Sequence, residues 1–129
     1  MVKGIIITDP VGDMLIRIKN AYLAGKESLD LPSSNAKVRV AKVLEKRNIV
    51  KAHSIKEGVM TIALNIERDR VLQIKRLSTS GKRIYMGYSQ LYSVKGGRGF
   101  LLVNTSQGMM TEVEAKKKKI GGEVLAEIF

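Results

Sequence analysis

Apolar residues recur at helical spacing in two stretches of the first half of the chain. Asp9 can cap a helix and Pro10 suits a first helical turn. Intervals of three and four then predict a helix that ends at Gly25 and buries Val11, Met14, Leu15, Ile18 and Tyr22. A second helix is predicted over residues 35–47, capped by Ser33 or Ser34, with Asn48 in the left-handed position after it. Its inward residues are Val40, Ala41, Val43 and Leu44.

Extended segments separate and follow these helices. Residues 28–32 alternate and stop at Pro32, which is typical of an edge strand. Residues 49–56 and 59–65 predict a hairpin that turns at Glu57 and Gly58. We expect its second strand to present one apolar face, made of Met60, Ile62, Leu64 and Ile66. The charged residues 67–70 predict an exposed connection.

The second half of the chain is dominated by extended segments. Strands are predicted over 71–78 and 83–86 with a turn at Ser80 and Gly81, and over 100–103 and 123–129, whereas 91–94 fits helix or strand. The small and polar residues 104–108 predict a loop. Met109 and Met110 then lead into a short helix with a capping box at Thr111 and Glu114, ending in four lysines at 116–119. We therefore expect an α+β fold of two small lobes. The N-terminal lobe, 1–66, is mixed α/β in the order helix-strand-helix-strand-strand, and the C-terminal lobe, 67–129, is mainly β with one short helix.

Composition argues against most enzyme classes. The 129 residues include no Cys and one His, so no thiolate metal site or imidazole-based triad can form. The acidic residues are dispersed, and the glycine cluster at 96–99 lacks the spacing of a phosphate-binding loop, which favours a simple turn. His53 lies in a predicted strand and is given no chemical role. We expect no catalytic residue, metal, cofactor or small-molecule substrate.

Charge points instead to a polyanionic partner. Lys and Arg number 23 against 12 Asp and Glu, a net charge of +11. Basic residues occur on predicted strands and loops as well as helices, which favours nucleic acid over a membrane surface. On the first helix, Asp13 and Arg17 can pair, and Arg17 and Lys19 fit either a solvated face or a phosphate contact. No apolar run is long enough to cross a bilayer, so we expect a cytoplasmic protein that is monomeric in isolation.

The predicted loop at 104–108 has the chemistry of an RNA contact. Its short neutral side chains can meet sugar hydroxyls and base edges in the shallow minor groove of double-stranded RNA, and we expect the N-terminus of the next helix beside it. An ordinary strand-to-helix turn explains the same residues equally well.

Two motifs resemble the family of bacterial-type small-subunit ribosomal protein eight. They are GFLLVNTSQGMMTEVEAK at residues 99–116, continued by Gly121-Gly122-Glu123, and TDPxxDMLxRIxNA at residues 8–21. The resemblance implies two lobes that bind a helix in the central domain of 16S rRNA through a Ser-Thr-Ser loop, matched here by Asn104, Thr105 and Ser106. Together with nearby basic residues, the predicted RNA-binding residues are Thr8, Arg17, Asn20, Lys82, Arg83, Asn104, Thr105, Ser106, Gln107, Gly108, Gly121, Gly122 and Glu123.

The resemblance also implies partners and a cellular role. We expect a structural constituent of the small ribosomal subunit that contacts neighbouring ribosomal proteins and helps to assemble the 30S platform. The family further suggests repression of translation through an mRNA that mimics the rRNA site. This chain has an amide at Asn104 where the family has a hydroxyl, which changes the reach of that side chain. A nucleoid-type DNA-binding protein is the alternative, because it would carry a similar charge.

Overall fold

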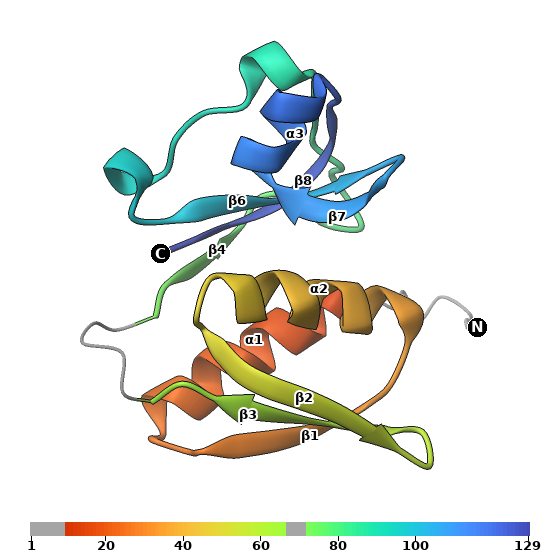
Figure 1. The fold of residues 1–129 in the computed structure, drawn as a ribbon, viewed down its shortest axis with the longest axis vertical. Helices are drawn as coiled ribbons and strands as arrows, with labels where there is room; N and C mark the ends of the chain where they lie inside the picture. Colours follow the sequence, from red (N-terminus) through yellow and green to blue (C-terminus); the bar gives the residue numbers. More distant parts are fainter. Residues whose placement is uncertain (1–9, 67–71) are drawn as a thin grey trace.

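The computed structural model describes residues 10–66 and 72–129. In Figure 1 two helices and a three-stranded sheet form the lower part of the molecule, and a second, larger sheet with one short helix forms the upper part. This arrangement confirms the predicted α+β fold. The proposed cap Asp9 and the charged connection at 67–70 lie outside the described residues, and the division into lobes at 66 and 67 stays a prediction.

Both predicted N-terminal helices are present. Helix α1 spans Pro10–Leu23 and α2 spans Asn35–Lys46. Ser34 is the cap of α2, because its hydroxyl accepts a hydrogen bond from the backbone N–H of Lys37 at 3.3 Å. Gly25 and Asn48 adopt the left-handed backbone expected after each helix, with φ of 69° and 62°. The inward residues predicted for α2 are buried, as are Met14, Leu15 and Ile18 of α1.

The two helices cover one face of a sheet in the order β1-β3-β2, formed by β1 (Ser28–Pro32), β3 (Val59–Leu64) and β2 (Val50–Lys56). β1 is an edge strand, as predicted. Glu57 and Gly58 both have positive φ, which matches the right-handed twist of the hairpin strands. Met60, Ile62 and Leu64 are buried. Ile66 was wrongly placed on this face: it lies beyond the end of β3 and is 41% exposed.

The second sheet follows the order β4-β8-β6-β7, with β5 also paired to β8. Its strands are β4 (Ile74–Arg76), β5 (Tyr85–Met86), β6 (Phe100–Thr105), β7 (Gly108–Thr111) and β8 (Gly122–Ile128). β4 and β5 are shorter than the predicted strands 71–78 and 83–86. A bridge between Thr79 and Lys82 closes the predicted turn between them. Short 3-10 turns η2 (Tyr88–Gln90) and η3 (Lys95–Gly97) flank residues 91–94, which are neither helix nor strand.

The loop predicted at 104–108 is wrong, because Asn104 and Thr105 continue β6. Their backbones pair with β8 on one side and β7 on the other, and this pairing outweighs the polar side chains. Met109 and Met110, predicted to lead into a helix, lie in β7. A tight β6–β7 hairpin therefore replaces the loop.

Helix α3 spans Glu112–Lys118 and begins at the predicted cap, where the Thr111 hydroxyl accepts from the N–H of Glu114 at 3.4 Å. The reciprocal half of the predicted capping box is replaced by another contact: the Glu114 carboxylate lies 3.9 Å from the ammonium of Lys46 on α2. The N-terminus of α3 was also expected beside residues 104–108, and this prediction is wrong. Strand β7 lies between the hairpin turn and α3 and separates them by about 10 Å.

The two sheets share one apolar core. Phe100, Leu102, Ala126 and Ile128 pack with the buried residues of α1, α2 and β3, while a second cluster lies on the α3 side of the larger sheet. Arg47 at the end of α2 strengthens the connection: its guanidinium donates to the Gly99 carbonyl at 3.2 Å and lies 4.9 Å from the Phe100 ring centre. These contacts fix the larger sheet on the helices.

Candidate nucleic-acid interface

Five of the predicted residues form the hairpin tip, which we define as residues 104–108. Ser106 and Gln107 make the turn, and Gly108 has a φ of 115° that favours glycine. The Thr105 hydroxyl donates to the Gly108 carbonyl at 2.8 Å and accepts from the Gln107 N–H at 3.1 Å. Thr105 thus holds the turn in shape, whereas Asn104, Ser106 and Gln107 are exposed.

The predicted glycine pair lies directly beside the hairpin tip. Gly122 pairs with Thr105, and a Cβ at Gly122 would lie only 2.3 Å from the carbonyl oxygen of Asn104. A Cβ at Gly121 would lie 2.2 Å from the carbonyl oxygen of Met86. Both contacts are with backbone, which cannot move aside as a flexible side chain can. The two glycines therefore allow β5, β8 and β6 to approach one another at the end of the sheet.

Glu123 binds one basic side chain, that of Arg83, at this end of the sheet. Its carboxylate accepts hydrogen bonds from the Ser78 hydroxyl and from the Arg83 guanidinium, the latter at 3.1 Å. The Ser78 hydroxyl in turn accepts from the N–H of Ile84 at 3.1 Å. The Glu123 side chain is 13% exposed and that of Arg83 is 51% exposed. Glu123 thus orients Arg83 while the guanidinium stays open to an anion, and Lys82 is exposed in the adjoining turn.

Tyr85 was not predicted to belong to this surface. Register places Tyr85, Glu123, Asn104 and Met109 in one row across four strands, so these side chains share a face of the sheet. Tyr85 is 68% exposed. An aromatic ring next to Lys82 and Arg83 is a signal that the sequence did contain, because bases stack on such rings while cations bind phosphate.

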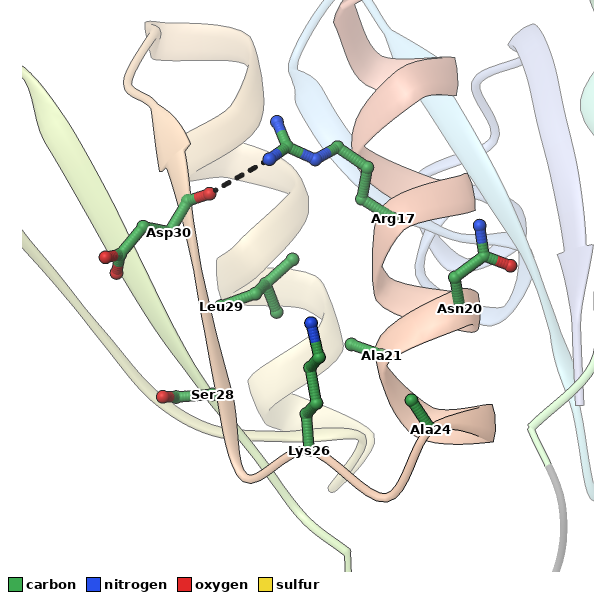
Figure 2. A pocket seen from close by; sticks show the side chains of 8 residues that line it. All are labelled: Arg17, Asn20, Ala21, Ala24, Lys26, Ser28, Leu29 and Asp30. Atoms are coloured by element: carbon green, nitrogen blue, oxygen red, sulfur yellow. Dashed lines mark hydrogen bonds between the residues drawn. The ribbon is translucent and has the colours of Figure 1, made fainter.

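The residues predicted on the first helix divide between two places. The first turn of α1 lies near the basic end of the sheet, since Val11 and Gly12 line a small pocket with Arg83. Thr8 lies outside the described residues. Arg17 and Asn20 lie elsewhere, in an open groove of about 460 Å³ between α1 and β1 (Figure 2). The structure does not bring them together with the hairpin tip.

Other chemistry is sparse in the described ranges. There, no group of three or more His, Cys, Asp or Glu side chains is arranged to hold a metal ion. His53 on β2 contacts the carboxylate of Glu45 on α2. None of the helices in the described part is long and apolar enough to cross a membrane.

A basic surface around an uncharged hairpin is consistent with RNA binding, and comparison with known proteins decides the family. The family model of ribosomal protein S8 matches residues 9–129. The chain belongs to the ribosomal protein S8 family. It is 39% identical to small ribosomal subunit protein uS8 of Geobacter sulfurreducens over 95% of this chain and 98% of the relative. The uS8 proteins of Caldanaerobacter subterraneus and Pelagibacter ubique are 40% and 34% identical, over 96% and 95% of this chain and 99% and 98% of theirs.

Proposed function

We propose that this chain is a structural component of the small ribosomal subunit and that its hairpin tip binds the minor groove of an rRNA helix in the central domain of 16S rRNA. The single observation that carries the proposal is the convergence of separate segments at one end of the larger sheet. The hairpin tip, the pair Gly121 and Gly122, and the Glu123-Arg83 ion pair meet there. The membership of this chain in the ribosomal protein S8 family supports RNA as the ligand.

On this surface, different residues supply the affinity for RNA and the specificity for one RNA sequence. Lys82 and Arg83 supply cations for phosphates, which bind without regard to sequence. Asn104, Ser106 and Gln107 offer uncharged donors and acceptors on short side chains, which suit the wide and shallow minor groove of A-form RNA. Thr105 and Gly108 hold the turn in shape. In this proposal Glu123 contributes by orienting Arg83 rather than by touching RNA.

The proposed role is that of a binding protein without catalytic activity, located on the cytoplasmic ribosome. Adjacent ribosomal proteins and the rRNA are its partners, and assembly of the 30S platform is its contribution. Repression through an mRNA that carries a similar helix follows from the same surface, because any RNA that presents the same minor groove would bind there.

Substitution of Ser106 tests the specific contact. Ser106→Ala removes an exposed hydroxyl from the turn, and Ser54→Ala removes an exposed hydroxyl from β2 as the matched control. Filter binding should show that S106A weakens binding to the cognate rRNA helix by about 0.5–1.5 kcal/mol, while S54A leaves it unchanged. Equal losses for cognate and unrelated duplexes would mean that the hairpin tip does not supply specificity.

Footprinting on purified small-subunit rRNA tests the binding site. Protection in the central domain is expected, and its absence would refute the assignment. A nucleoid-type function predicts instead that duplex DNA competes as well as RNA at equal salt concentration. Because charge neutralisation is shared by DNA and RNA, both competitions must be compared at several salt concentrations.

A further inference from the structure

Strand β8 contains a β-bulge at Leu125, where the register of its pairing with β6 shifts. On a regular strand, residues two apart face the same side of the sheet. Val124, however, packs in the cluster on the α3 side, whereas Ala126 packs in the core shared with the helices. The bulge therefore reverses the alternation along β8 and brings Glu123 to the face of the sheet that carries Asn104.

Strand β8 also changes its second neighbour at this bulge. The Leu125 carbonyl accepts hydrogen bonds from the backbone N–H groups of Leu77 and Ser78, at 3.0 and 3.4 Å. Beyond this point the chain leaves the sheet. It returns at Ile84, whose carbonyl accepts from a backbone N–H of β8 at 2.9 Å. Between its departure and its return the chain forms a basic turn, which we define as residues 79–83.

Ser78 connects the two ends of the basic turn. Its hydroxyl accepts from the N–H of Ile84 at 3.1 Å and donates to the carboxylate of Glu123. Its carbonyl accepts from the guanidinium of Arg76 at 3.4 Å. Because Ser78 is only 4% exposed, it has almost no surface to offer to RNA. Any influence of its hydroxyl on RNA binding must therefore pass through its neighbours.

The basic turn projects from the sheet into solvent. Thr79 and Lys82 close it by exchanging backbone hydrogen bonds of 2.9 and 3.1 Å. At its tip, a Cβ at Gly81 would have no atom within 4 Å, so no packing holds the tip from outside. The direction in which the turn projects is consequently set where its two ends join the sheet, which is where Ser78 lies.

We propose that Ser78 is a positioning residue for RNA binding, which fixes the cationic part of the surface relative to the hairpin tip. This inference rests on the proposed function. The hydroxyl holds the Glu123 carboxylate and the return of the turn in one place, and that carboxylate holds the Arg83 guanidinium at 3.1 Å. A guanidinium that is already ordered loses less side-chain entropy when it binds a phosphate. Ser78 thus raises affinity without touching RNA.

Substitutions of Ser78 in the full chain test this proposal on the isolated rRNA helix. Ser78→Ala should weaken binding about three- to tenfold and flatten the salt slope by roughly 0.7–0.9, because one phosphate contact is lost. Ser78→Thr keeps the hydroxyl and should restore binding. Ser34→Ala is the matched control, since it also removes a hydroxyl that bonds to backbone, at the start of α2. Both alanine variants should unfold at lower temperature, but only S78A should bind RNA more weakly.

A double-mutant cycle with Arg83→Gln separates positioning from general stability. If Ser78 acts through Arg83, S78A should weaken the unsubstituted protein but cause no further loss in R83Q. The side-chain N–H signals of Arg83 in NMR spectra give a second measurement. They should broaden in S78A, because the guanidinium then exchanges its protons with water more freely. Equal losses of affinity from S78A in both backgrounds would overturn the proposal.

The remaining outcomes distinguish this proposal from the proposed function. If R83Q and S106A weaken binding but S78A does not, Ser78 has no positioning role, and the proposed function stands. If neither R83Q nor S106A weakens binding, the proposed function fails and the role of Ser78 fails with it. Should S78A not fold, the cycle of Glu123→Gln and R83Q replaces it. The loss from E123Q should vanish in R83Q, and additive losses would refute the proposal.

Discussion

The hairpin tip and the α1–β1 groove are built in opposite ways. The hairpin tip carries no charge, and its shape is held by backbone pairing on two sides, by Gly108 and by the Thr105 hydroxyl. The groove is open and lined in part by the cations Arg17 and Lys26, of which Arg17 donates a side-chain hydrogen bond to β1. A fixed uncharged surface can read shape and base edges, whereas flexible cations bind any phosphate. Changes of shape should therefore impair recognition by the hairpin tip more than changes of salt concentration do.

Gly122→Ala should have the largest effect on the hairpin tip. The added Cβ would lie 2.3 Å from the Asn104 carbonyl oxygen and 3.0 Å from the Thr105 Cα, so β6 or β8 must shift. We expect a loss of about 3 kcal/mol in the free energy of unfolding, from urea denaturation, because backbone rather than side chain obstructs the new methyl. Binding to the isolated rRNA helix should fall in parallel.

Gly81→Ala is the matched control, because a Cβ there has no atom within 4 Å and Gly81 does not have a positive φ. It should leave stability within about 0.5 kcal/mol of the unsubstituted protein. If G122A is equally well tolerated, the close approach of β8 to β6 does not hold the hairpin tip.

Glu123→Gln should have the next largest effect, because it removes the charge that holds Arg83 and keeps the shape of the side chain. We expect the free energy of unfolding to fall by about 1–2 kcal/mol, because a hydrogen bond to a charged group contributes about 1.5–3 kcal/mol and solvent screens the half-exposed Arg83. Affinity for cognate and unrelated RNA should fall by a similar factor in competition binding, because Arg83 contacts phosphate without regard to sequence. Unchanged affinity for both RNAs would mean that the orientation of Arg83 is unimportant for binding.

Thr105→Val separates the organisation of the turn from contact with RNA. The variant keeps the β-branched shape but loses both hydroxyl bonds within the hairpin, and we expect about 1 kcal/mol of destabilisation. Ser106→Ala should leave stability unchanged and weaken only binding. Thermal unfolding of the two variants checks this contrast, which is lost if S106A is as destabilised as T105V.

Lys117→Gln and Lys118→Gln should have the smallest effects. These exposed lysines lie in the last turn of α3, where cations interact favourably with the helix dipole, so each is expected to contribute about 0.3–1 kcal/mol of stability. The dependence of rRNA affinity on salt should not change. A slope that flattens by about one contact per residue would instead make α3 a second phosphate-binding surface.

Local patterns predicted most of the N-terminal half correctly because its signals lie close together in the sequence. Ser34 caps α2 from the adjacent residue, Asn48 ends the helix, and Glu57 with Gly58 turns the hairpin. Ile66 was misplaced because strand periodicity continues in the sequence beyond the point where pairing with β1 and β2 ends. Periodicity does not locate the last paired residue.

The C-terminal half was harder to predict because its strands pair with partners distant in the sequence. Asn104 and Thr105 have the composition of a loop but are strand residues, because β8 supplies backbone partners from nearly twenty positions away. The role of Glu123 likewise depends on Ser78 and Arg83, which lie 45 and 40 positions away. The family resemblance groups Arg17 and Asn20 with the hairpin tip, but the structure places them in the groove between α1 and β1.

The sequence by itself determined the α+β class, the helices, the caps Ser34 and Thr111, the family and the net positive charge. These depend on composition and on neighbours within a few residues. The tertiary structure decided that residues 104–108 form a tight hairpin, that Gly122 makes room for it, and that Arg17 and Asn20 line a separate groove. Such features depend on which backbone lies beside which, and pairing between distant strands and the orientation of a packed helix leave no local pattern.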